Sequence, residues 1–126
     1  MINFIPISDY FWPPKQITEN NFEIFIPFDC SIRPATSYIV NLQFKTEVKD
    51  VEKPFEFIFK LDYSLSIQET LSCINYDFFN LESKDDSICL YNHCIPEQRN
   101  SFNYTFGDRN TKKIKNGTKL GNLILI

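Results

Sequence analysis

The single histidine and two nearby cysteines are the first residues whose types suggest chemistry. His93 lies between Cys89 and Cys94, and thiol and imidazole groups at this spacing could bind zinc. Alternation along a strand would place Cys89 and His93 on one face and Cys94 on the other, and no fourth ligand is evident. Any Ser-His-Asp or Cys-His set would also need His93, and no Gly-x-Ser-x-Gly motif accompanies it. We therefore interpret His93 as a structural residue and expect no metal and no cofactor.

Charged side chains form two further groups. Glu82, Asp85 and Asp86 could hold a hard cation, although a solvated turn is the commoner structure for such a cluster. Basic residues gather late in the chain, where a solvated loop is favoured over a phosphate-binding patch. These residues are Arg109, Lys112, Lys113, Lys115 and Lys119. The net charge of -3 and the pI near 5.1 argue against a general nucleic-acid binder, whose affinity would come mainly from neutralising phosphates.

The composition is that of one soluble β domain. The chain has 126 residues, about the size of a single compact core. Aromatic residues make up 16% of it, with 13 Phe and a single Ala, and this balance favours strands over helices. No apolar run approaches the roughly 20 residues that span a bilayer, and the N-terminus does not resemble a signal peptide. We expect an intracellular protein without membrane contact, whose four cysteines are free thiols.

Strand signals and turn residues divide the chain. Pro13 and Pro14 interrupt regular structure, so we expect an N-terminal arm at 1–14 and a β domain at 15–126. The clearest strand signal is at 54–61, where Phe55, Phe57 and Phe59 share one face. Segment 68–83 is predicted to be either helical or a loop with one helical turn. Further strands are expected at 1–7 as an arm or edge strand, and at 22–28, 37–46, 64–67, 87–91, 102–106 and 120–126.

Three stretches resemble, in order, the trimeric deoxyuridine triphosphatase (dUTPase) family. Segment 22–40 begins with the aromatic-acid-apolar strand Phe22-Glu23-Ile24, segment 88–93 ends in Asn92-His93, and segment 114–125 resembles the closing Ile-x-x-Gly-Asp-Arg-Ile-Ala-Gln-Leu-Ile signature. The resemblance implies one all-β domain with a jelly-roll-like, distorted β-barrel fold. It also implies a homotrimer whose active sites form between subunits.

The resemblance places five residues at nucleotide-site positions of the family. Glu23 replaces the Asp of the first motif, and Asn122 stands where the closing strand has Gln. Asn75 occupies the place of the catalytic Asp, Asp77 that of the second Asp, and Phe78 replaces the Tyr that packs under the deoxyribose. An amide cannot take a proton from water near neutral pH, so Asn75 would not be a general base. In a shifted alignment Asp77 is the equivalent of the catalytic Asp.

The phosphate-binding motifs of the family are also missing from the sequence. No Arg occurs between Arg33 and Arg99, so the Arg-Ser pair is absent. The last glycine is Gly121, so no glycine-rich segment follows the closing strand to cradle phosphates. These losses predict that the chain is not an enzyme but an inactive relative of dUTPase.

Three functions fit these observations. The favoured one is a non-catalytic homotrimer that acts as a structural or protein-interaction module, with Phe11 and Trp12 as interface anchors for a protein partner. The alternative is residual deoxyuridine nucleotide binding or hydrolysis. A third is an unrelated β-sandwich module that binds sugar or peptide. The abundance of Asn, Ile, Lys, Phe and Tyr is typical of AT-rich genes such as viral ones, and a viral protein would act in the cytoplasm or nucleus of the host cell or in the virion.

Overall fold

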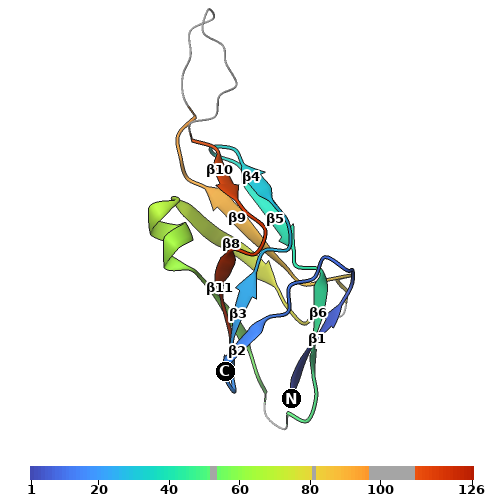
Figure 1. Ribbon diagram of the computed structural model, residues 1–126. Helices are drawn as coiled ribbons and strands as arrows, with labels where there is room; N and C mark the ends of the chain where they lie inside the picture. Colours follow the sequence, from blue (N-terminus) through green and yellow to red (C-terminus); the bar gives the residue numbers. More distant parts are fainter. Residues whose placement is uncertain (52–53, 81, 97–109) are drawn as a thin grey trace, which may run out of the picture.

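The computed structural model describes residues 1–51, 54–80, 82–96 and 110–126, and almost all of the regular secondary structure of these residues is β-strand (Figure 1). The expected all-β class and dUTPase-like fold in one domain are confirmed. The elements are β1 Ile2–Pro6, β2 Lys15–Thr18, β3 Asn21–Phe25, β4 Cys30–Ile32, β5 Ser37–Asn41, β6 Phe44–Val48, β7 Phe57–Leu61, the π-helix η1 Ser64–Gln68, β8 Leu71–Asp77, β9 Ser87–Asn92, β10 Lys112–Ile114 and β11 Lys119–Leu125.

The strands pair in four antiparallel groups within the described residues. The largest sheet has the order β2-β3-β11-β7, and a second sheet has the order β5-β9-β8. Two ribbons, β1-β6 and β10-β4, complete the set. The closing strand β11 lies between β3 and β7, so the last segment of the chain pairs with one of the first. Both chain ends lie at the lower end of the molecule as it is drawn in Figure 1.

Alternating apolar residues of the sheets build one hydrophobic core. In β9, Ile88 and Leu90 point inward between half-buried Ser87, Cys89 and Tyr91, as the two-residue period of a strand requires. The fully buried side chains come from both sheets, from β4 and β6, and from the segments that follow β3 and β5. The largest are Phe44, Ile24, Ile26, Ile32, Leu42, Leu71, Ile88, Leu90, Leu120 and Leu123.

The N-terminal strand β1 packs against this core. It pairs with β6 over its whole length, from Ile2 opposite Val48 to Pro6 opposite Phe44. The Phe4 ring meets the Phe22 and Phe44 rings edge to face at centroid distances of 5.1 and 5.2 Å. Edge-to-face pairs add to the free energy that burial of the rings supplies. The first strand therefore contributes apolar surface to the domain.

Gly121 allows the closing strand to approach its neighbour. A Cβ atom at this position would lie 2.0 Å from the Lys60 carbonyl oxygen and 2.8 Å from the Phe59 ring. Since the first of these is a main-chain atom, no rotamer change relieves the clash. The β3 ladder also shifts register between Lys119 and Gly121. This position of β11 thus requires glycine for packing.

Three of the expected elements differ from the structure. Segment 68–83 is neither helix nor loop with one helical turn, because Leu71–Asp77 forms strand β8 along β9. Segment 64–67 is helical where a strand was expected, and the predicted strand at 37–46 is two strands separated at Gln43, whose φ is 65°. For Leu71–Asp77, pairing with β9 outweighs the local helical spacing. The strand expected at 102–106 lies outside the described residues.

Candidate functional site

Glu23 and Asn122 lie opposite each other in the largest sheet. Glu23 is in β3 and Asn122 is in β11, and the two are cross-strand partners. The Asn122 amide donates to Asn21 Oδ1 at 2.8 Å. Glu23 also faces Lys15 of β2, and Asn122 also faces Lys60 of β7. Because directly opposed residues share one face of a sheet, these side chains form a polar row across all four strands.

A cluster of charges adjoins this row at Glu23. Lys119 Nζ lies 2.8 Å from Glu23 Oε2 and 3.6 Å from Asp62 Oδ1. Asp62 also accepts a hydrogen bond from the Ser64 hydroxyl at 2.6 Å. The hydrogen bond to Glu23 raises the pKa of Lys119, and the hydrogen bond from Ser64 lowers the pKa of Asp62. Lys119 and Asp62 are therefore ionised near neutral pH.

The sequence indicates two of the three residues of this cluster. The family motif indicates Glu23 and the late basic group includes Lys119, but nothing in the sequence connects these two residues to each other or to Asp62. Asp62 follows β7 at the start of η1, and its main-chain N–H donates to the Leu120 carbonyl at 2.8 Å. The only local signal for it was the sequence Asp-Tyr-Ser, in which an Asp can bond the main chain two residues on.

Asn75, Asp77 and Phe78 lie together at β8. Asn75 is exposed and follows a bulge in the pairing with β9. Asp77 accepts hydrogen bonds from the Ser83 hydroxyl at 2.5 Å and from the Asn80 amide at 3.5 Å. Those contacts tie the carboxylate to the loop that follows β8.

Phe78 belongs to a group of aromatic rings between β7 and β8. It stacks on Phe59 with a centroid distance of 6.1 Å and an interplanar angle of 24°. Tyr76 contacts both rings at 6.2 and 6.3 Å. Phe59 is opposite Leu123 in the ladder, so the group connects β8 to the sheet that carries the polar row. No hydrogen bond or ion pair joins Asn75 or Asp77 to Glu23 or Asn122 within the described residues.

The acidic loop differs from the expected solvated turn. Asp86 is completely buried, and its carboxylate accepts hydrogen bonds from the Thr46 N–H at 2.8 Å, from the Thr46 hydroxyl and from the Phe79 N–H at 3.3 Å. Lys45 Nζ lies 3.8 Å from it. Burial raises the pKa of Asp86, while the hydrogen bonds from Thr46 act in the opposite direction. Asp86 therefore anchors the loop to β6.

His93 makes a hydrogen bond of 2.6 Å between its Nε2 and the Ser72 hydroxyl, and its ring meets Tyr91 edge to face at 4.7 Å. Cys73, Cys89 and Cys94 are half-buried free thiols. Burial raises the pKa of the Cys30 thiol to about 11. No group of three His, Cys, Asp or Glu side chains suited to a metal ion occurs among the described residues.

Phe11 and Trp12 have different surroundings. The Phe11 ring is partly buried and meets Phe44 at 6.2 Å. Trp12 keeps 43% of its surface exposed, and its Nε1 donates to Asn116 Oδ1 at 2.6 Å. It also covers Gly117, where φ is 86°. Trp12 is thus the more accessible of the two candidate anchors.

Comparison with known proteins identifies the fold. No protein-family model matches the sequence, and no curated protein matches it. Solved structures of phage dUTPases do match. The dUTPase of phage phi11 of S. aureus, as a mutant, gives a TM-score of 0.77 at 13% identity, covering 100% of this chain and 90% of that one. The Staphylococcus phage 80alpha dUTPase with dUpNHpp gives 0.79 at 10% identity, covering 100% and 82%. The chain has the dUTPase fold.

These matches correct one sequence-based prediction. The chain was expected not to be an enzyme, but the structures that share its fold over its whole length are dUTPases, and three of them were solved with dUpNHpp. Substitutions at single positions such as Asn75 do not establish that catalysis is lost. Identities of 9% to 13% show the fold and nothing finer. Within the described part of the chain, no helix has the length and apolar character needed to cross a bilayer.

Proposed function

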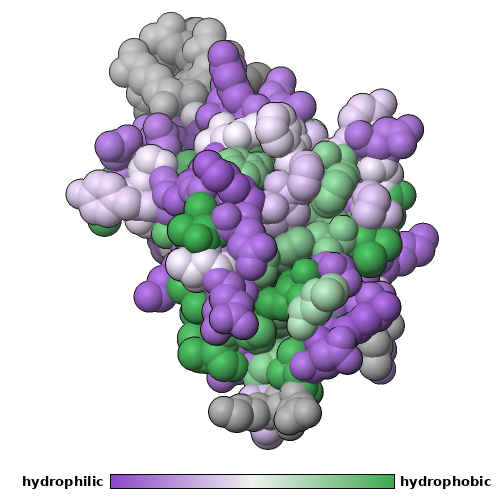
Figure 2. All heavy atoms as spheres, turned by 60° about the horizontal axis from the view of Figure 1, so that its bottom comes forward, coloured by the Kyte–Doolittle hydropathy of each residue, from purple (hydrophilic) through white to green (hydrophobic). Residues whose placement is uncertain are grey.

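We propose that the chain is a homotrimeric protein of the dUTPase fold that acts through protein contacts. The observation that carries this proposal is the apolar surface around the two chain ends, visible in Figure 2. Met1, Ile5, Ile17 and Ile126 are between 44% and 71% exposed. A pocket of about 510 Å³ in this region has Ile2, Phe22 and Leu125 among its lining residues. Exposed apolar side chains that gather on one face are typical of a surface that meets another protein.

The structural neighbours support a protein-contact role. Phage 80alpha dUTPases have been described as controlling the transfer of virulence genes by a G protein-like mechanism. A dUTPase fold can therefore serve a regulatory task in a phage. The amino-acid composition of this chain is typical of AT-rich genes, and its structural neighbours come from phages. Both observations favour a viral protein that acts inside a host cell.

Molecular mass in solution tests the assembly. Light scattering after gel filtration should give a mass three times that of the 14.9 kDa chain. Trp12→Ala should shift the distribution toward monomer if Trp12 anchors the interface, because exposed aromatic anchors supply much of the binding free energy. Tyr10→Ala is the matched control, since Tyr10 is also exposed and is two residues away. A strictly monomeric wild-type protein at all concentrations would contradict the proposal.

A second candidate function is binding or hydrolysis of a deoxyuridine nucleotide. The pairing of Glu23 with Asn122 favours it, because the dUTPase resemblance places both at nucleotide-site positions. A ligand that binds only the folded state raises the melting temperature. We therefore expect a thermal shift with dUpNHpp and Mg²⁺, and a pyrophosphate-release assay with dUTP would measure turnover. Absence of both at millimolar nucleotide would exclude this function.

A further inference from the structure

We propose that Asn116 is a deamidation site and that Trp12, in the segment between β1 and β2, controls how fast it is modified. Asn116 and Gly117 form the one Asn-Gly pair of the sequence, in the turn between β10 and β11. Asn is a chemically labile residue. Because glycine has no Cβ, its main-chain nitrogen can approach the preceding Asn side chain closely. The residue types at this turn are therefore those that react most readily.

The modification needs only water and proceeds in two steps. The Gly117 main-chain nitrogen bonds to Asn116 Cγ, the Cγ–Nδ2 bond breaks, and Nδ2 leaves as ammonia with the proton of the Gly117 N–H. Water then adds to one of the two carbonyl groups of the resulting cyclic imide, whose bond to nitrogen breaks while the nitrogen takes a proton. Opening at Cγ gives aspartate, and opening at the main-chain carbonyl gives isoaspartate.

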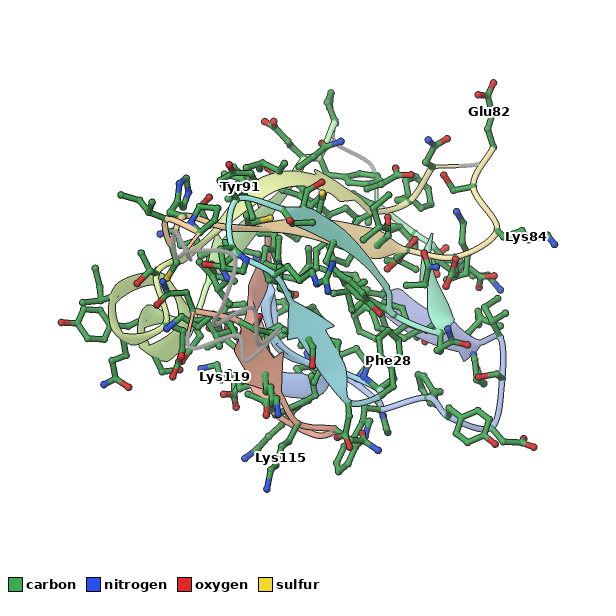
Figure 3. All side chains as sticks on the ribbon, turned by 90° about the horizontal axis from the view of Figure 1, so that it is seen from above. Phe28, Glu82, Lys84, Tyr91, Lys115 and Lys119 are labelled. Carbon is green, nitrogen blue, oxygen red and sulfur yellow. The ribbon has the colours of Figure 1, made fainter. Side chains whose placement is uncertain are left out.

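The turn presents this pair to solvent. The Thr118 N–H donates to the Lys115 carbonyl at 3.0 Å, and Gly117 has a φ of 86°, as the third residue of a type II turn requires. Asn116 is exposed. Lys115, the residue before it, points away from the ribbon in Figure 3. Water therefore has access to the carbonyl groups that the second step attacks.

Two hydrogen bonds hold the reacting groups apart in the folded chain. Asn116 Oδ1 accepts from Trp12 Nε1 at 2.6 Å, which fixes the orientation of the side-chain amide. The Gly117 N–H donates to the Ile26 carbonyl at 2.8 Å, so the attacking nitrogen is directed toward β3 and its proton is retained. Ring closure requires both groups to turn toward each other. Each hydrogen bond therefore slows the first step.

The Trp12 ring also covers the glycine. A Cβ atom at Gly117 would lie 3.0 Å from Trp12 Cζ2 and 3.3 Å from Cη2, so the indole lies directly against this residue. The indole is held in turn by Phe25, at a centroid distance of 6.1 Å, and its neighbour Phe11 packs on Phe44. Movement of Trp12 away from the turn is thus the event that permits deamidation.

Either product disfavours the present turn. Asp29 Oδ1 accepts a hydrogen bond from the Asn116 N–H at 2.7 Å, so an aspartate at position 116 would bring a second negative charge to this carboxylate. Isoaspartate adds a further atom to the main chain between Lys115 and Thr118, whose hydrogen bond closes the turn. A modified chain should therefore hold Trp12 less tightly.

Peptide mapping by mass spectrometry tests the site during incubation of the full chain at neutral pH. Asn116 should be modified about tenfold or more faster in urea than in the folded protein, because both hydrogen bonds are lost. Trp12→Phe keeps an aromatic ring but lacks the indole N–H, and it should accelerate the modification in folded protein about threefold or more. Tyr10→Phe is the matched control, since Tyr10 is exposed and two residues away, and it should leave the rate unchanged.

Several results would overturn the proposal. Absence of modification in urea would exclude the site, and equal rates in urea and in folded protein, or in Trp12→Phe and Tyr10→Phe, would exclude its protection by Trp12. Urea unfolding of each variant gives its unfolded fraction. An acceleration in Trp12→Phe no larger than this fraction explains would equally exclude a local role for Trp12.

Fluorescence reports the release of Trp12 directly, because it is the only tryptophan of the chain. Quenching by acrylamide should increase as the modified fraction grows, and unchanged quenching in fully modified protein would contradict the release. The contacts lie within one chain, so the rate ratio between Trp12→Phe and wild type should persist on dilution. Loss of that ratio on dilution would refute an intramolecular contact, whereas the trimer is tested separately by the mass measurement.

Discussion

Asp86 offers the sharpest test of the structure, because the sequence and the structure give it opposite environments. The sequence suggests a carboxylate in a solvated turn or a cation-binding loop. The structure buries it completely beneath β6 and the loop after β8. Asp86→Ala should therefore destabilise the protein strongly, whereas an exposed carboxylate could be removed at little cost.

The contacts of Asp86 set the size of the effect. Its removal leaves the N–H groups of Thr46 and Phe79 without their acceptor, and each buried N–H left unpaired costs about 1–3 kcal/mol. Lys45 keeps hydrogen bonds to the Asn80 and Ser83 carbonyls, so it is not left unpaired. We expect a loss of about 3–5 kcal/mol, a large share of the roughly 5–15 kcal/mol of a typical domain.

Urea unfolding followed by circular dichroism measures this loss. Asp85→Ala is the matched control, since Asp85 is half-buried and accepts one hydrogen bond of 3.3 Å from the Gln43 N–H. We expect that control to cost below about 1 kcal/mol. Equal and small losses of stability in the two variants would refute the burial of Asp86. They would show that the loop is solvated, as the sequence suggests.

The same residue predicts a pH dependence. Burial raises the pKa of Asp86 above the unfolded value near 3.9, so the folded protein binds this proton more tightly than the unfolded chain. Its contribution to stability is therefore greatest below about pH 4 and decreases as the pH rises through the folded pKa. Asp86→Asn lacks this titration. The difference in unfolding free energy between wild type and variant should decrease over that window, and a constant difference would contradict the raised pKa.

Three other perturbations follow from single contacts. Gly121→Ala should cost about 3 kcal/mol or more, because its Cβ would meet the Lys60 carbonyl, and a melting temperature within a few degrees of wild type would refute this. Glu23→Gln should cost less than about 1 kcal/mol, because the Lys119 pair is partly exposed, and urea unfolding in high salt should reduce the cost further. Cys30 should alkylate far more slowly in the native protein than in urea, since burial raises its pKa to about 11, and equal rates by mass spectrometry would contradict its burial.

Strands with a regular two-residue alternation could be predicted from local pattern, whereas β8 could not. Alternation of Phe57 and Phe59 gives the buried face of β7, and the structure buries both rings. Segment 71–78 has apolar residues at helical spacing, but Ile74 lies at a bulge and is exposed. This segment forms a strand because it pairs with β9. The spacing of apolar residues within 71–78 carries no information about that partner.

The residues of the candidate site could likewise be predicted only in part from the sequence. The dUTPase resemblance assigns Glu23 and Asn122 to two different motifs, and the structure makes them cross-strand partners. Asp62 joins them only because β7 is the other neighbour of β11 and η1 begins at its end. No periodicity links these three segments before the sheet order is known.

The two faces of the β2-β3-β11-β7 sheet have different tasks: the core face stabilises the fold, and the outer polar row carries the candidate site. Pairing of β11 with β3 and β7 fixes the backbone at Glu23, Asn122 and Lys60, whatever side chains they carry. Alternate residues such as Leu123 and Phe59 face the core and supply the stability. The outer row can therefore change without loss of the fold, which explains how it persists at 9–13% identity.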